Sequence, residues 1–246
     1  MAFVARTVGG LLAVLTAELA WTIWRPLPSF RDLDSSGWEG PEDGRPLRLV
    51  AVGDSSCTGP GLTDPADIWL RQLARRIGSE GYRVEVMSFA VGGSKAKDVV
   101  ADQLEAAVAA AGDVAIVSIG GNDAMRGEPL DRFERSLEEI ARRLSTTCPL
   151  VMLSGVGDIA TIPRLPAPLA SLARRRGIRL DRIHKAVAAR TGVVAADQWV
   201  WAVERFRDPT LFSDDLFHPN RRGHEVWAEV GWETLSPFLD LDGADA

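Results

Sequence analysis

A serine in one loop and an aspartate and a histidine in another could together carry out nucleophilic catalysis. Ser55 follows a short apolar run and lies where that run turns into a helical pattern. His218 precedes Pro219, which favours an extended loop, and Asp215 lies three residues upstream. In such an arrangement Ser55 would attack a carbonyl, His218 would accept its proton, and Asp215 would orient the imidazole. The serine position also suits a helix N-cap, so further support is needed.

Acyl transfer additionally requires N–H donors for a developing oxyanion. The backbone N–H of Ser55, the backbone N–H of Gly93 and the side-chain amide of Asn122 could supply them. Glycine suits a position where the backbone must approach a substrate closely. Gly and Asn are also ordinary turn residues, so neither Gly93 nor Asn122 is informative by itself.

The elements that must position these residues alternate from Leu47 onward between apolar strands and amphipathic helices. The expected strands are 47–52, 83–90, 113–119, 150–154 and 193–196. The expected helices are 67–79, 95–111, 130–144, 167–190 (with a break considered at Gly177) and 221–239. This alternation predicts an α/β/α three-layer sandwich around a five-stranded, mostly parallel sheet. The loops with Ser55, Gly93 and Asn122 then meet at the carboxyl edge of the sheet, and the His218 loop can return to it.

Four short motifs occur in order along the chain. They are Gly53-Asp54-Ser55, Gly93, Gly120-Gly121-Asn122-Asp123 and Asp215-Leu216-Phe217-His218. Together they resemble the motif blocks of the SGNH, or GDSL-type, hydrolases, over about residues 48–227. The sequence departs from the family pattern at Ser56, where the family has leucine; this position takes no part in the chemistry.

The resemblance implies a flavodoxin-like sheet and an esterase or lipase-like acylhydrolase that forms an acyl-enzyme on Ser55. Its register favours Asp215 over the neighbouring Asp214 as the partner of His218. The expected substrate is a small-molecule, lipid or glycan ester, with no cofactor. The same site would also suit a carbohydrate O-deacetylase or a thioesterase. We expect Asp54 to hold the turn and Asp123 to be a turn residue that could help to position the site.

Two other readings remain open. Ser94, in Gly92-Gly93-Ser94-Lys95-Ala96, nearly matches the nucleophile elbow of α/β-hydrolases, but too few strands precede it. The same glycines could cradle a phosphate in a non-catalytic binding module, although no complete phosphate-loop motif is present. The histidines lack metal-ligand spacing, so no metal site is expected. We expect His184 at a solvated helix face and His224 in a capping or surface role.

Composition narrows the classes of partner but leaves the redox character of the compartment open. The 246 residues are 46% hydrophobic and 25% charged, which is ordinary for a globular protein. The net charge of −6 offers no basic face for nucleic acid. Cys57 and Cys148 lie far apart and indicate neither a disulfide framework nor a zinc site.

The N-terminal part of the chain differs from the rest. An apolar stretch over 8–24 contains one charge, Glu18, and leads us to expect an N-terminal helix within 1–25. We favour a membrane anchor or interfacial helix over one docked on the domain, and over a cleaved signal peptide. A cytoplasmic location stays open. Residues 26–46 are rich in Pro, Gly, Asp and Ser and are expected to be a linker before the hydrolase domain at 47–246.

Overall fold

The computed structural model describes residues 10, 12–18, 20–21 and 30–239, which include one six-stranded sheet. Its strands are β1 (Gly37–Glu39), β2 (Arg45–Gly53), β3 (Tyr82–Ser88), β4 (Val114–Ser118), β5 (Leu150–Leu153) and β6 (Val194–Ala195). The spatial order is β1-β3-β2-β4-β5-β6. Every neighbouring pair is parallel except β1 with β3. The expected five parallel strands are therefore present, with a sixth added at one edge.

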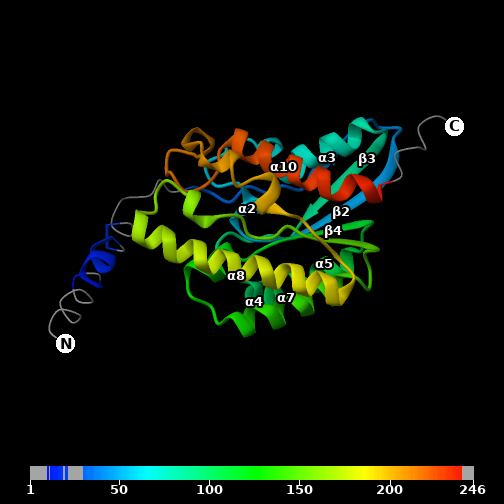
Figure 1. Cartoon of the computed structure of the whole chain (residues 1–246). Helices are drawn as coiled ribbons and strands as arrows, with labels where there is room; N and C mark the ends of the chain where they lie inside the picture. The colour runs from blue at the N-terminus through cyan, green and yellow to red at the C-terminus, as the bar shows by residue number, and fades with distance from the viewer. Residues whose placement is uncertain (1–9, 11, 19, 22–29, 240–246) are drawn as a thin grey trace.

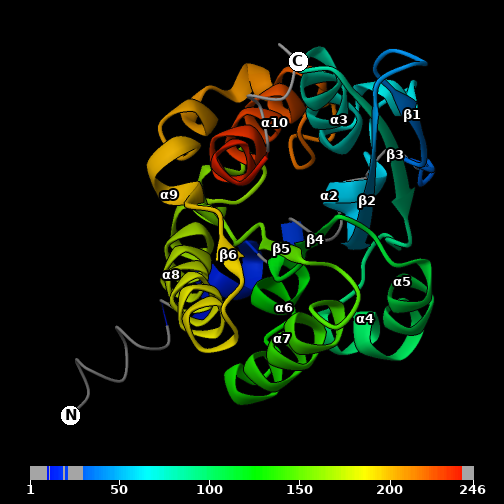
Figure 2. The same ribbon diagram turned by 90° about the vertical axis from the view of Figure 1, so that its right-hand side faces the viewer.

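Helices cover both faces of this sheet, as the alternating pattern predicts. They are α2 (Ser55–Thr58), α3 (Trp69–Ser79), α4 (Ala96–Asp102), α5 (Leu104–Ala110), α6 (Gly121–Met125), α7 (Leu130–Leu144), α8 (Ala167–Thr191), α9 (Gln198–Trp201) and α10 (Arg221–Leu235). Viewed along the sheet, α3 and α10 lie on one side, and α4, α5, α7 and α8 lie on the other (Figures 1 and 2). Helix α8 continues through Gly177 without a break.

The apolar residues of strand β2 contribute to two hydrophobic clusters, one on each face of the sheet. Leu49 and Ala51 pack into the cluster beneath α3 and α10, whereas Val50 and Val52 pack into the opposite cluster. All four side chains are buried to 1% exposure or less. A strand buried on both faces has to be apolar throughout, which is why the run is continuous rather than alternating.

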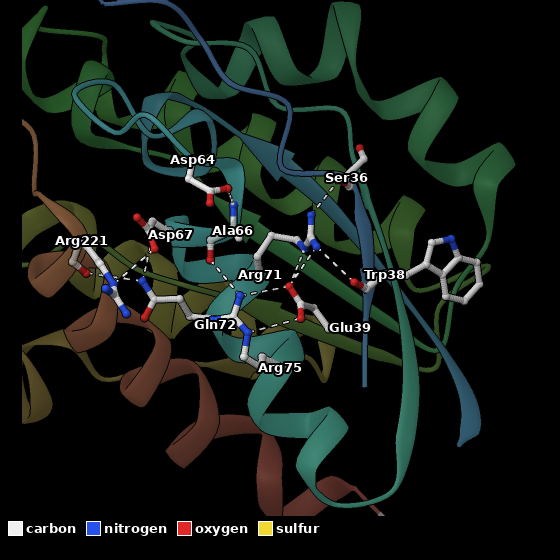
Figure 3. Close-up of polar contacts among 10 residues, drawn as sticks. All are labelled: Ser36, Trp38, Glu39, Asp64, Ala66, Asp67, Arg71, Gln72, Arg75 and Arg221. Carbon is white, nitrogen blue, oxygen red and sulfur yellow. Dashed lines mark hydrogen bonds and ion pairs between the residues drawn. The ribbon is translucent and has the colours of Figure 1, made fainter. Parts of the chain in front are cut away.

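The segment expected to be a linker requires a correction, because its residues 37–39 form strand β1. Arg71 of α3 attaches this strand: its guanidinium donates to the Ser36 and Trp38 carbonyls and pairs with the Glu39 carboxylate at 2.9 Å (Figure 3). A side chain at Gly37 would overlap that guanidinium. A strand of three residues is too short to show a periodic pattern in the sequence. It is held by a distant arginine and by pairing with β3.

The single helix expected over 95–111 is also wrong, because it is divided into α4 and α5 at Gln103. Gln103 is 2% exposed, and its amide turns inward to the end of β2. Helical periodicity continues across the division, so hydrophobic pattern alone could not reveal it.

Two histidines expected near the surface are buried. His184 is 1% exposed and packs on the Phe133 ring, so its expected solvated position is wrong. His224 is also 1% exposed, and its Nδ1 accepts the Trp69 N–H at 3.2 Å, near the start of α3. A capping role for His224 is therefore correct, but the helix end that it caps is not its own.

The expected helix over 8–24 lies partly outside the described residues. Its described positions are helical, and Leu12 and Trp21 are each more than half exposed. Within the part of the chain that the structure describes, none of the helices combines the length and apolar character that crossing a bilayer requires.

The two buried histidines predict that the free energy of unfolding falls on acidification. Histidine in an unfolded chain has a pKa of about 6.5. Burial lowers the pKa of His184 to about 4 and that of His224 to about 3. At pH values between its folded and its unfolded pKa, each histidine binds a proton in the unfolded chain but not in the folded chain. Each therefore makes the free energy of unfolding fall by up to about 1.4 kcal/mol per pH unit of acidification.

Urea unfolding at pH steps from 7 down to about 4 measures that slope. We expect His184→Leu to reduce it by the contribution of one proton, whatever the variant does to stability at pH 7. Asp123 acts in the opposite direction, because burial raises its pKa to about 6 and protonation favours its folded state. Comparing wild type and variant cancels that contribution, and equal slopes would contradict the prediction.

Candidate active site

The loops at the carboxyl edge of the sheet enclose a cavity of about 180 Å³. Ser55, Asn122 and His218 all line it, so three of the residues predicted from sequence come to one place. Most of its surface is apolar, with walls that include Ile119, Val156, Ile159, Val203, Phe206 and Trp227. Ligands of open α/β sheets bind at this edge.

Ser55 is the first residue of α2, directly after β2. Gly53 ends the strand with φ of 159°, and a side chain there would overlap the Ser118 carbonyl of β4. Asp54 caps α2 by accepting the Ser56 N–H at 3.0 Å, which confirms the expectation that it holds the turn. Burial raises the pKa of Asp54 despite this hydrogen bond. The close strand packing and the cap together place the half-buried Ser55 at the cavity.

His218 and Asp215 form a hydrogen-bonded pair. The His218 Nδ1 lies 2.6 Å from Asp215 Oδ2, while Asp215 Oδ1 accepts the backbone N–H groups of Phe217 and His218 at 2.9 and 3.0 Å. Burial acts to raise the pKa of Asp215, but these hydrogen bonds outweigh it and hold the pKa below its ordinary value. A buried carboxylate that stays ionised can orient the imidazole and stabilise its protonated form. The neighbouring Asp214 is exposed.

Two aromatic rings flank the His218 imidazole. Phe217 lies with its ring centroid 4.8 Å away and Phe30 at 6.4 Å, both roughly perpendicular to it. No hydrogen bond joins Ser55 to His218 in the described part of the chain, although both line the same cavity. Contacts of this kind often shorten only when substrate is bound.

The candidate oxyanion donors occupy the neighbouring loops. Asn122 Nδ2 lies 3.4 Å from Asp54 Oδ2, so its amide is directed towards the turn that carries Ser55. Gly93 has φ of 79°, which favours glycine, and its carbonyl accepts a hydrogen bond from Arg126 at 3.1 Å. Gly93 is not among the residues that line the cavity. The structure therefore brings Asn122 to the cavity and leaves Gly93 in the adjoining turn.

Asp123 connects the Asn122 loop to that turn. It is fully buried, and its carboxylate accepts the Ala96 N–H at the start of α4 at 3.1 Å. Its role extends beyond the turn in which it lies, because it holds two site loops together.

The alternative nucleophile Ser94 is engaged elsewhere. It is 8% exposed, donates to the Val91 carbonyl at 2.8 Å and accepts from Gln103 at 3.1 Å. Cys57 is similarly unsuited to nucleophilic chemistry, because burial raises the pKa of its thiol to about 12. Neither side chain lines the cavity.

Gln103 is a site residue that sequence reasoning missed. Its amide accepts the Gly53 N–H and donates to the Gly53 carbonyl, both at 2.9 Å, and also donates to Ser94 Oγ. It therefore joins the strand end before Ser55 to the turn that carries Gly93. The sequence signal that could have revealed it is a glutamine on an otherwise apolar helix face. A side-chain amide buried at such a position requires hydrogen-bond partners elsewhere in the fold.

We expect Gln103→Leu to lower the free energy of unfolding by about 1–3 kcal/mol, because it leaves the buried Gly53 N–H without its acceptor, while the Gly53 carbonyl keeps the Val91 N–H as a donor. Chemical denaturation measures this loss. Gln72→Leu is the matched control, since it removes a hydrogen bond from a half-buried glutamine to the Asp67 carbonyl. Equal losses in the two variants would contradict the role assigned to Gln103.

A family model described as the GDSL-like Lipase/Acylhydrolase family matches residues 51–226, which include every catalytic and oxyanion candidate named above. The chain belongs to this family. The resemblance seen in the four sequence motifs is thereby confirmed, and so is the expected α/β/α fold.

Two curated family relatives are similar over 78% of this chain. A "GDSL-like esterase" of Mycobacterium tuberculosis is 28% identical over 198 residues, which are 63% of that protein. This chain therefore spans less than two thirds of the mycobacterial relative's length. Esterase TesA of Pseudomonas aeruginosa is 26% identical over 192 residues, 89% of its length.

Solved structures show the same fold. A crystal structure of TesA matches with a TM-score of 0.64 at 25% identity, over 78% of this chain and 99% of that one. An acetylxylan esterase of Geobacillus stearothermophilus matches with a TM-score of 0.62 at 20% identity, over 78% and 95% of the two chains. The second likeness bears on the fold alone.

Proposed function

We propose that this protein is a serine hydrolase that cleaves carboxylic esters. The observation that carries the proposal is that His218, hydrogen-bonded to the buried Asp215, lines the same cavity as Ser55. Membership of a family whose relatives are named esterases supports it. A non-catalytic binding module would have no use for a carboxylate-oriented histidine that shares a cavity with a helix-terminal serine.

The proposed reaction has two steps. Ser55 Oγ attacks the ester carbonyl while His218 Nε2 accepts its proton, and His218 returns that proton to the departing alcohol. The acyl group stays on Ser55 until water attacks it while His218 accepts a proton from that water. The bond between the acyl group and Ser55 Oγ then breaks, His218 returns the proton to Ser55 Oγ, and the acid is released. Asp215 holds the ring with Nε2 free to accept, because Nδ1 is bonded to the carboxylate. The Ser55 N–H, the Gly93 N–H and Asn122 would stabilise the oxyanion.

The apolar character of the cavity favours an ester with an apolar portion. Phe206, Trp227 and Ile159 are among its walls, and apolar surface gains free energy by displacing water. A small-molecule or lipid ester suits such walls better than a glycan ester. Sugar deacetylation and thioester cleavage use the same chemistry and are alternative substrate classes for the same residues.

Hydrolysis of p-nitrophenyl esters of graded chain length tests the proposal. We expect Ser55→Ala and His218→Ala to lower kcat/KM by about 10³- to 10⁴-fold or more, because such residues act as a unit. Asp215→Asn should have a loss of similar order, whereas Asp214→Asn, its exposed neighbour, should retain activity.

Covalent labelling by a fluorophosphonate locates the nucleophile, because the reagent needs an activated serine. Label on wild type and on Ser94→Ala, but not on Ser55→Ala, is expected. A wild type that neither cleaves esters nor takes up label would overturn the proposal in favour of a binding module.

We also propose that the N-terminal helix associates with a membrane surface. Its described residues expose Leu12 (58%) and Trp21 (53%), side chains that favour an interface. The full chain is expected to float with lipid vesicles, and Leu12→Ser/Trp21→Ser should remain in solution with esterase activity unchanged. Equal distribution of both proteins would contradict the association.

A further inference from the structure

Residues 30–36 lie outside the region that the family model matches, yet they contact the candidate active site. We call these residues the strap. Its first residue, Phe30, faces His218 edge-on. The Leu33 N–H donates to the Thr58 carbonyl at 2.9 Å, and Ser36 Oγ accepts the Ser88 N–H at the end of β3. The strap therefore follows the same sheet edge as the cavity before it enters β1.

Asp32, in the middle of the strap, connects the two loops that matter most for the proposed chemistry. Its Oδ1 accepts the hydroxyl of Thr58 at 2.7 Å, and its Oδ2 accepts the N–H of Gly92 at 3.1 Å. Thr58 is the last residue of the short helix that Ser55 begins. Gly92 precedes Gly93, the candidate oxyanion donor.

The turn is shaped around this carboxylate. A side chain at Gly92 would overlap Asp32, and Gly92 does not have the positive φ that requires glycine elsewhere. The absence of a side chain at this position is therefore explained by the approach of Asp32 rather than by backbone conformation.

We propose that Asp32 is a positioning residue that sets the oxyanion turn relative to the nucleophile helix. The inference rests on the proposed function. The Gly93 N–H belongs to the peptide that follows Gly92, so a fixed Gly92 N–H limits where the next N–H points. Oxyanion donors act on the transition state more than on bound substrate, and small displacements of such groups are costly.

The expected kinetic result is a loss in kcat rather than in affinity. Asp32→Ala should lower kcat by about 10- to 100-fold with KM changed less than twofold, because the lost alignment acts in the transition state. Asp32→Asn should recover most of the loss, since its amide oxygen accepts the Gly92 N–H and its NH₂ donates to Thr58.

Asp34→Ala is the matched control. Asp34 lies on the same strap and is exposed, and its carboxylate accepts the Ser36 N–H at 2.8 Å without touching the site loops. It should leave kcat unchanged. If Asp32→Ala behaves like Asp34→Ala, or loses activity only in proportion to its folded fraction, the positioning role is overturned.

The variant Gly92→Ala provides a second, independent test of the role of Asp32. Its methyl group should displace the Asp32 carboxylate and reproduce the kcat loss of Asp32→Ala, and the double variant should lose little more than either single one. Fully multiplicative losses would show that the two residues act separately and would overturn the coupling.

Hydrogen–deuterium exchange of the Val91–Ser94 amides separates this inference from the proposed function, because it needs no activity. Exchange should rise in Asp32→Ala and stay unchanged in Asp34→Ala. Faster exchange with full kcat would refute positioning while leaving ester hydrolysis intact. A wild type inert to esters and fluorophosphonate would overturn the proposed function, and the role of Asp32 in it, even if exchange responded.

Discussion

The close packing of β2 against β4 at Gly53 is the constraint on which the rest of the site depends. Gly53 leaves no room for a side chain next to the Ser118 carbonyl, which also accepts the Asp54 N–H at 3.1 Å. Gln103 binds both backbone groups of the same glycine. The end of β2 is thereby held from the side of β4 and from the helix layer, and α2 can begin at one defined place.

Three buried carboxylates and one exposed carboxylate then hold the surrounding loops by accepting backbone N–H groups. Asp54 accepts from its own helix, Asp123 from the start of α4, and Asp215 from the two residues before Pro219. Asp32 does the same for Gly92 from outside the matched domain. Charge-assisted hydrogen bonds to backbone amides suit this purpose, because they are directional and roughly twice as strong as neutral ones.

The three histidines show how environment separates residues of one type. His184 and His224 are buried without a carboxylate partner, and burial lowers the pKa of each to about 4 and 3 respectively. Both therefore remain neutral near pH 7 and serve packing and capping. His218 is half-buried at the cavity, and its Nδ1 is hydrogen-bonded to the ionised Asp215 carboxylate. A proton acceptor in the proposed reaction needs that combination of access and orientation.

The sequence by itself determined the layered α/β fold and the loops that follow its parallel strands. It also determined the candidate residues Ser55, Asn122, Asp215 and His218. Continuous apolar runs and motif spacing are local properties, so they can be read along the chain. The tertiary structure alone revealed β1, the division at Gln103, the burial of His184 and the contacts of Asp32. Each of these depends on a partner distant in sequence: Arg71 for β1, Gly53 for Gln103, Phe133 for His184, and Gly92 for Asp32. Polar side chains that meet only after the sheet has formed leave no periodic signal, which is why residues 30–36 could be taken for a linker.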